Sequence, residues 1–234
     1  NWPVSISASR WSRLPERAHS LKLMLHDPSH RPQPITTEPI QLQPDEEEVL
    51  RRLVAELAQV AAQPVHREKA ELWRRLNDLE SERPMVWINE IPWHEMDVND
   101  ELRPRAKDPL CQGIETDLRR TLYMWKHMPG DMVADASIAQ PLCFQDTGFG
   151  IDEEVDIVRT DPRSDVVSRR FHVQIKDEGD IAKIKMPKVT FDAERTEEEY
   201  AMRCDIFAGI LPVEKRGLPF NERAGIRCFW FAPW

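Results

Sequence analysis

The 234-residue sequence contains no apolar run that approaches the ~20 residues needed to cross a bilayer. Its first residues also lack the apolar segment that a secretory signal peptide carries. Cysteine is scarce, and the four that occur (Cys111, Cys143, Cys204 and Cys228) follow no CxxC spacing. In a chain of this size, this pattern favours reduced thiols over a disulfide framework. These absences together predict a cytoplasmic protein with no membrane partner.

Basic residues are outnumbered: 32 Lys and Arg stand against 41 Asp and Glu, which gives a net charge of −9. A groove for nucleic acid needs clustered Lys and Arg, so the balance excludes nucleic acid as a partner. Hydrophobic residues make up 41% of the chain and charged residues 31%, which is typical of a globular protein. The length allows one medium domain with a hydrophobic core, or two small domains.

Prolines separate the start of the chain from the rest. Residues 1–43 are interrupted by six prolines, which remove amide donors and prevent long helices, so we predict an irregular Pro-rich arm. Residues 44–234 are predicted to form the folded part. Three histidines of the arm (His19, His26 and His30) have no nearby cysteine and no ordered spacing, so we expect no metal site there.

Helical periodicity is clear in several segments. Apolar residues recur at helical spacing in 45–63, 66–79, 109–127 and 193–210, and a shorter helix is predicted over 180–185. Asp45 is predicted to cap the first helix, and Pro109 suits the first position of the third. The Pro129–Gly130 pair is a usual stop signal for that third helix.

Short apolar runs predict the strands of an α/β fold. Residues 85–88 lie in a proline-bounded apolar run that is typical of a strand buried on both faces, and 131–135 are predicted as a second one. With the helix between them they would form a βαβ unit. Residues 155–158 and 171–175 alternate as in a hairpin, which we predict to be inserted as a flap. Further strands are predicted over 211–214 and 226–231.

Polar side chains gather after the first predicted strand. In α/β folds chemistry collects beyond the carboxyl ends of strands, which points to Asn89, Glu90, Trp93, His94 and Glu95. His94 could act as a general acid or base, with Glu90 or Glu95 orienting it or serving as a metal ligand. The alternative is that Trp93 and His94 pack a loop while the two glutamates bind backbone amides. A zinc-protease HExxH motif is excluded because Val98 occupies the position of the second histidine.

Asp135 ends the second predicted strand. A carboxylate there must be hydrogen-bonded, paired or solvated, because burying it bare is costly. A catalytic role and a structural role as a cap both remain open. The glycines of the sequence GFG at 148–150 are expected to serve a turn, since a phosphate-binding loop would need a third glycine and a following helix.

Several segments in order resemble the uroporphyrinogen decarboxylase-like family: RPMVWINEIPWHEM, DPLCQGIETDLRRTLYMWKHMPGDMV, HVQIKDEGDIAKIKMPKV and FWFAPW. The resemblance covers roughly residues 66–234. It implies part of a (β/α)8 TIM-type barrel, with an N-terminal helical extension, an inserted β-hairpin, and a site at the carboxyl ends of the strands. About half a barrel is present, so the chain is expected to be incomplete as given. An open barrel edge implies a homo-oligomer or a partner that covers it.

Members of this family decarboxylate acetate side chains of a tetrapyrrole or move methyl groups between a corrinoid and an acceptor such as a thiol. The resemblance therefore implies a lyase or methyltransferase acting on a small-molecule or tetrapyrrole/corrinoid ligand. Order along the chain places Asp135 near the family's strand-end Asp, which handles pyrrole nitrogens. The zinc ligands of the methyltransferases come from the later half of the barrel, so no metal site is predicted within this sequence, and the cofactor is left open.

Two hypotheses follow. In the first, Asp135, His94 and Glu90 are catalytic, and Asn89, Trp93 and Glu95 bind substrate at the barrel mouth. In the second, the chain is a non-catalytic, truncated relative that serves as a binding or assembly subunit.

Overall fold

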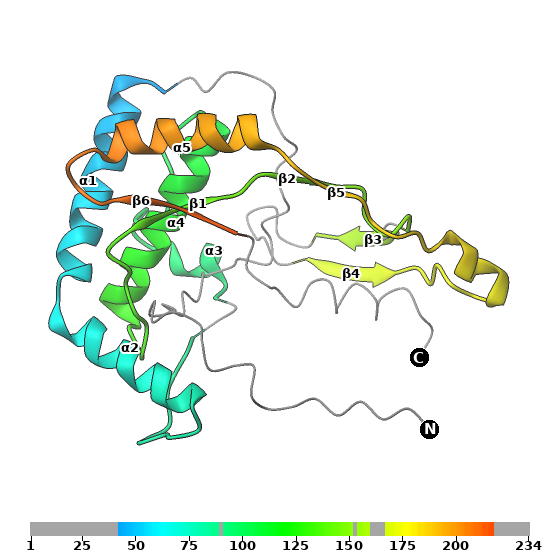
Figure 1. The fold of residues 1–234 in the computed structure, drawn as a ribbon, viewed down its shortest axis with the longest axis horizontal. Coiled ribbons are helices and arrows are strands. Elements are labelled where there is room, and N and C mark those ends of the chain that lie inside the picture. Colours follow the sequence, from blue (N-terminus) through cyan, green and yellow to red (C-terminus); the bar gives the residue numbers. More distant parts are fainter. Residues whose placement is uncertain (1–41, 89–90, 152–153, 160–166, 218–234) are drawn as a thin grey trace, which may run out of the picture.

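The computed structural model describes residues 42–88, 91–151, 154–159 and 167–217. This part of the chain is mixed α/β (Figure 1), with helices that form a body and three two-stranded sheets. It contains no closed barrel among the described residues. None of its helices is long and apolar enough to cross a membrane. The predicted α/β class is confirmed, while the barrel stays a hypothesis.

Helix α1 (Pro44–Ala61) buries the apolar stripe that its sequence predicts. It begins one residue earlier than expected, and its N-cap is Gln43. The prediction that Asp45 caps this helix was wrong, because Pro44 already fits the first helical position and Glu46 turns back to accept a hydrogen bond from the Gln43 amide at 3.1 Å. Asp45 still lies in the first turn, where its charge favours the positive end of the helix dipole.

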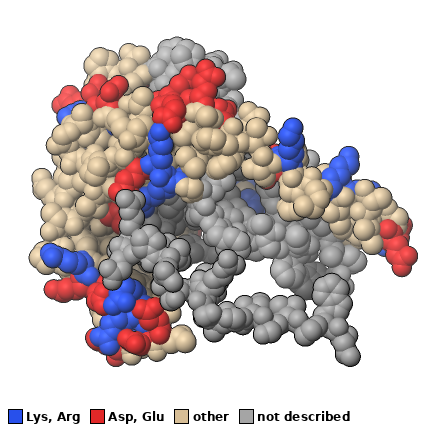
Figure 2. All heavy atoms as spheres, in the orientation of Figure 1, with Lys and Arg blue, Asp and Glu red and all other residues tan. Residues whose placement is uncertain are grey.

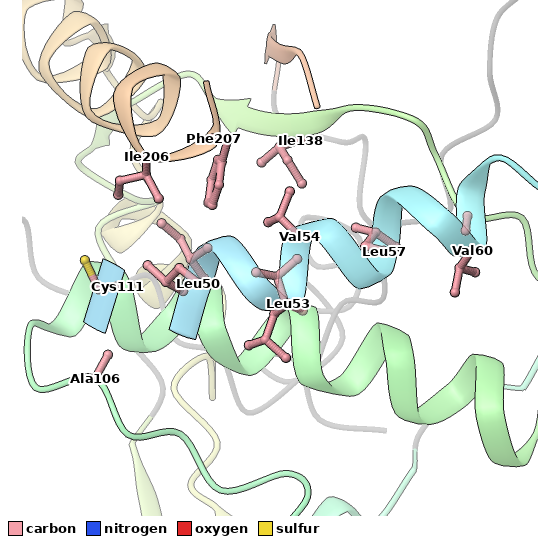
Figure 3. Packing of buried hydrophobic residues seen from close by; sticks show 13 residues of the cluster. Leu50, Leu53, Val54, Leu57, Val60, Ala106, Cys111, Ile138, Ile206 and Phe207 are labelled. Atoms are coloured by element: carbon pink, nitrogen blue, oxygen red, sulfur yellow. The ribbon is translucent and has the colours of Figure 1, made fainter. Parts of the chain in front are cut away.

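The main core lies where α1 packs against α4 (Pro109–His127) and α5 (Ala193–Phe207). Leu50, Val54, Cys111 and Phe207 are completely buried there. Figure 3 shows the ring of Phe207 pointing from the end of α5 towards α1, beside Ile138. Helix α2 (Pro64–Asn77) follows α1 after a short turn and buries only His66. The four long helices therefore agree with the predicted ones, and α4 agrees at both ends.

A parallel pair of strands lies beside α5. Strand β1 (Ile138–Pro141) pairs with β6 (Val213–Arg216), with Ile138 opposite Val213. Helix α5 lies between the two strands in the chain and contacts both of them. A β–α–β arrangement is thus present, but it uses other segments than the sequence predicted.

Neither strand of the predicted βαβ unit forms. Residues 85–88 form no strand, and Val86 is 54% exposed. Residues 131–135 are also irregular, and β1 begins only at Ile138. A strand buried on both faces needs neighbours on both sides. Here Asp131, with its carboxylate and its backbone amide, forms the hydrogen bonds with Val86 that a neighbouring strand would otherwise form.

That side chain is Asp131, which is 6% exposed. Its carboxylate accepts two hydrogen bonds from the Arg83 guanidinium, at 3.0 and 2.6 Å, and one from the Val86 amide at 2.7 Å. The Asp131 amide in turn donates to the Val86 carbonyl at 2.9 Å. Gly130 has a φ of +43°, and a Cβ there would come within 3.0 Å of the same carbonyl. The stretch predicted as a strand is therefore held by hydrogen bonds to the turn that follows α4.

We expect Asp131 to make stability depend on acid pH. The Arg83 hydrogen bonds, with the Val86 amide, lower the pKa of Asp131 from 3.8 to about 2. Because this folded-state pKa lies below the ordinary value, the contribution is complete above about pH 4 and is lost as pH falls through about 2. Urea unfolding of the Asp131→Asn variant should show a deficit of about 2 kcal/mol at neutral pH that shrinks below pH 4. A deficit that stays constant down to pH 2 would contradict this account.

The remaining strands form an extension that leaves the helical body to one side (Figure 1). Its base is the antiparallel pair β2 (Phe144–Asp146) and β5 (Val189–Phe191). Beyond it lie the antiparallel pair β3 (Val155–Val158) and β4 (Ser168–Phe171) and the 3-10 helix η2 (Glu178–Lys183). The predicted hairpin is confirmed, with its second strand three residues earlier than expected. The predicted 226–231 strand and residues 1–41 of the Pro-rich arm lie outside the described residues.

Candidate functional site

The short helix α3 (Trp93–Met96) carries three of the predicted site residues. Trp93 anchors it, since this side chain is 8% exposed and packs in a second small core with Leu102, Met124 and Met132. The Tyr123 ring meets Trp93 edge-on at 6.2 Å between centroids, and the Arg120 guanidinium lies 5.0 Å over the indole. Both geometries are favourable for aromatic rings. Helix α4 thus fixes α3 through an aromatic contact.

His94 and Glu95 follow this anchor directly. The His94 Nε2 atom lies 3.6 Å from a Glu95 carboxylate oxygen, and their side chains are 19% and 65% exposed. The imidazole of His94 is thus mostly buried, whereas the carboxylate of Glu95 is mostly exposed to solvent. A histidine beside a carboxylate is a common arrangement for general acid–base catalysis, and here the separation is slightly longer than a hydrogen bond. The structure therefore brings Trp93, His94 and Glu95 together, while Asn89 and Glu90 lie outside the described residues.

Asp135 is placed differently from its prediction. It lies three residues before β1 rather than at the carboxyl end of a strand, so that part of the prediction was wrong. Its Oδ2 atom accepts a hydrogen bond from Arg216 of β6 at 3.2 Å, and the same guanidinium donates to Ser137 Oγ at 2.9 Å. The side chain of Asp135 is 14% exposed. These contacts connect Asp135 to β6 and fit the structural role that the sequence left open.

His66 is a buried polar residue that the sequence analysis did not single out. It is 3% exposed, its Nδ1 atom accepts a hydrogen bond from the Ala134 amide at 3.1 Å, and its ring lies 4.5 Å from that of Trp125. Burial, followed by the charge of Lys69, lowers the pKa of His66. In the sequence, the burial of His66 was signalled by its helical spacing with Ala70 and Trp73, which places the three residues on one face of α2.

A second buried polar group joins α5 to β1. Arg203 donates hydrogen bonds to Gln140 Oε1 and, at 3.3 Å, to Glu199 Oε2. The Gln140 amide nitrogen also donates to Glu199 Oε2 at 3.2 Å, and Arg195 Nε donates to Glu199 Oε1 at 2.9 Å. Burial lowers the pKa of the Arg203 guanidinium, and the charge of Glu199 counteracts it. Because these buried polar groups form hydrogen bonds with one another, the network holds β1, and with it the pair of β1 and β6, against α5.

The described ranges contain no group of three or more His, Cys, Asp or Glu residues placed to hold a metal ion. Burial raises the pKa of the Cys111 thiol to about 12, which makes this thiol a poor nucleophile and a poor metal ligand. Three histidines of the described residues lie beside a carboxylate: His94 by Glu95 at 3.6 Å, His127 by Glu101 at 3.5 Å and His172 by Asp156 at 2.8 Å. The pair on α3 is the one whose histidine is least exposed, and it is the one that the sequence analysis predicted. Comparisons with protein-family models, curated proteins and solved structures find no match for the chain.

Proposed function

We propose that the chain is a uroporphyrinogen decarboxylase-like protein, a lyase or methyltransferase that acts on a small or tetrapyrrole-type ligand bound beside α3. The observation that carries the proposal is the His94–Glu95 pair on a helix fixed by the buried Trp93. The sequence segments that resemble the family support the choice of ligand class. Glu90 and Asn89, close to α3 in the sequence, belong to the proposed site, and Asp135 is proposed to contact the nitrogens of the ligand.

In the lyase form of the proposal, the bond between a side-chain carbon and its carboxylate breaks, and carbon dioxide leaves. The carbon then takes a proton, which replaces the carboxylate. The His94 imidazolium can donate this proton and recover one from solvent, since Glu95 beside it is mostly exposed. Glu95 stabilises the charged imidazolium before the transfer. Apart from the proton that solvent returns to His94, the step uses only groups of the chain and its ligand.

The experiment replaces His94 with glutamine, which keeps a polar side chain but cannot carry the proton. Decarboxylation of a reduced uroporphyrin and methyl transfer from methylcobalamin to a thiol are measured, together with absorbance titration of uroporphyrin. We expect the activity of His94→Gln to fall by about 10²–10⁴-fold, while ligand binding changes little. The matched control is His127→Gln on α4, where the histidine also pairs with a carboxylate, that of Glu101 at 3.5 Å.

Equal losses in the two variants would contradict a special role for His94. A wild-type chain that performs neither reaction and binds no porphyrin would overturn the enzymatic proposal.

A non-catalytic binding or assembly subunit is the second candidate. It is favoured by the parallel sheet, which contains only β1 and β6 within the described ranges. Parallel sheets are ordinarily larger and covered on both faces, and an unpaired strand edge attracts another strand. In this case a homo-oligomer, or a partner chain, covers the edge, and the wild-type protein shows neither activity in the same assays.

A further inference from the structure

The extension from β2 to β5 leaves much apolar surface exposed. Eight of the eleven exposed large hydrophobic side chains of the described residues lie on it. Six of these are about half exposed or more: Ile157, Val158, Ile181, Ile184, Met186 and Val189. Ile157 and Val158 are consecutive strand residues and point to opposite faces of the hairpin. Ile181, Ile184, Met186 and Val189 lie within nine residues of one another and present roughly 400 Å² of apolar surface, within the range of the largest patches on monomers. Such a surface indicates a site for another macromolecule.

Charge is unevenly distributed along the extension: residues 144–159 carry one Lys or Arg against five Asp and Glu, whereas the return segment, residues 168–189, is basic. Residues 168–189 carry six Lys and Arg against three Asp and Glu, although the net charge of the chain is −9. Figure 2 shows basic side chains along the extension and acidic ones gathered over the start of α5. Glu194 and Glu198 are exposed there, in the first two turns of that helix. The basic return segment, with its exposed apolar side chains, and the acidic helix start are complementary surfaces.

Both surfaces belong to one chain, yet the extension does not fold onto the helices. Its strands pair with each other, whereas the body helices pack with one another and with β1 and β6. Strand β5 leads directly into α5, so the extension runs away from the start of that helix (Figure 1). A second copy related by a two-fold axis can bring each extension to the other copy's α5.

We propose that the extension docks on the acidic start of α5 in a second copy of this chain, which forms a symmetric dimer by reciprocal exchange. When each apolar surface of roughly 400 Å² is matched by an equal area on the helix start that receives it, the two contacts bury roughly 1,600 Å² in total, a standard size for a stable protein interface. Lys185 and Lys188 of the extension face Glu194 and Glu198 of the other copy. Reciprocal contacts of this kind close the assembly at two chains. The dimer does not depend on whether α3 is catalytic.

The test measures mass by light scattering and sedimentation between about 1 and 100 µM, the range expected for an interface of this size. We expect a monomer–dimer equilibrium that weakens at high salt. The double variant Ile184→Ser/Met186→Ser should raise the dissociation constant at least about tenfold. The matched control is Leu79→Ser/Val98→Ser, which removes two side chains that are 93% and 81% exposed outside the extension.

Charge reversal tests the receiving surface. Lys185→Glu/Lys188→Glu and Glu194→Lys/Glu198→Lys should each weaken the homodimer, because each places like charges on both sides of the contact. Mixing the two variants should restore association. In the mixed dimer, the acidic extension of the first variant meets the basic helix start of the second, and the other contact keeps its original charges.

Three outcomes would overturn the proposal: a monomer throughout the concentration range, a dimer that the extension variants leave intact, or a mixture of the two charge-reversal variants that fails to associate. Binding of the wild-type monomer to anionic vesicles in place of dimerisation would also overturn it.

Discussion

Replacing Phe207 with alanine is expected to lower the free energy of unfolding by about 3–5 kcal/mol. Phe207 is completely buried at the end of α5, in the cluster that also holds Leu50, Val54 and Ile138. Removing the ring takes away buried apolar surface and leaves a cavity at the point where α1, α5 and β1 meet. Rigid helices on several sides prevent the cavity from collapsing, so the loss should lie near the upper part of that range.

Urea unfolding followed by circular dichroism measures this loss. Phe207→Leu is the graded control, because it keeps most of the apolar volume and should cost markedly less. Phe191→Ala removes the same side chain from a position that is 47% exposed, and at low protein concentration it should cost less still. Equal losses for Phe207→Ala and Phe191→Ala would show that the core is not where the structure places it.

Glu115→Ala is expected to cost a similar amount, about 3–5 kcal/mol, although it removes a charged residue. Glu115 is 1% exposed on α4. Its carboxylate accepts hydrogen bonds from the amides of Arg105 and Ala106, at 2.7 and 2.8 Å, and from Arg119 Nε at 2.7 Å. The alanine variant leaves two amides without their acceptor and the mostly buried Arg119 without its counter-charge.

A double-mutant cycle separates these contributions. If the unpaired Arg119 charge dominates, Glu115→Ala/Arg119→Ala should be more stable than the sum of the single losses predicts. If the backbone amides dominate, the double variant should be no better than Glu115→Ala. Glu71→Gln is the matched surface control, since Glu71 also pairs with an arginine of its own helix but is exposed, and it should change stability little. A Glu115 variant as mild as Glu71→Gln would contradict the structural role.

Glu115 also matters for the candidate site. Together with Glu46, whose carboxylate accepts a hydrogen bond from the Lys107 amide at 2.6 Å, it holds residues 105–107 ahead of α4. Helix α4 then carries Arg120 and Tyr123 to Trp93. The position of His94 and Glu95 thus depends on buried carboxylates that are distant from them in the sequence. Destabilising variants at Glu115 should therefore also weaken any activity at His94.

The sequence by itself determined the four long helices of this protein, but not the short helix α3. Their apolar spacing and their end signals are local, so α4 extends from Pro109 to His127 as predicted, and α1 and α2 begin within two residues of their predicted starts. The hairpin of β3 and β4 was likewise predicted, because the two strands are close in the chain. For the candidate site, the sequence was sufficient to place Trp93, His94 and Glu95 side by side.

Only the tertiary structure decided what the short apolar runs become. Residues 85–88 have the composition of a buried strand, but a strand exists only when distant backbone groups pair with it. Asp131 forms a hydrogen bond with the Val86 amide instead. The parallel pair forms between β1 and β6, which lie about 75 residues apart in the chain. The same holds for Asp135, whose partner Arg216 comes from β6. Non-local hydrogen bonds and ion pairs leave no periodic signal in the sequence, because they depend on which elements meet in space.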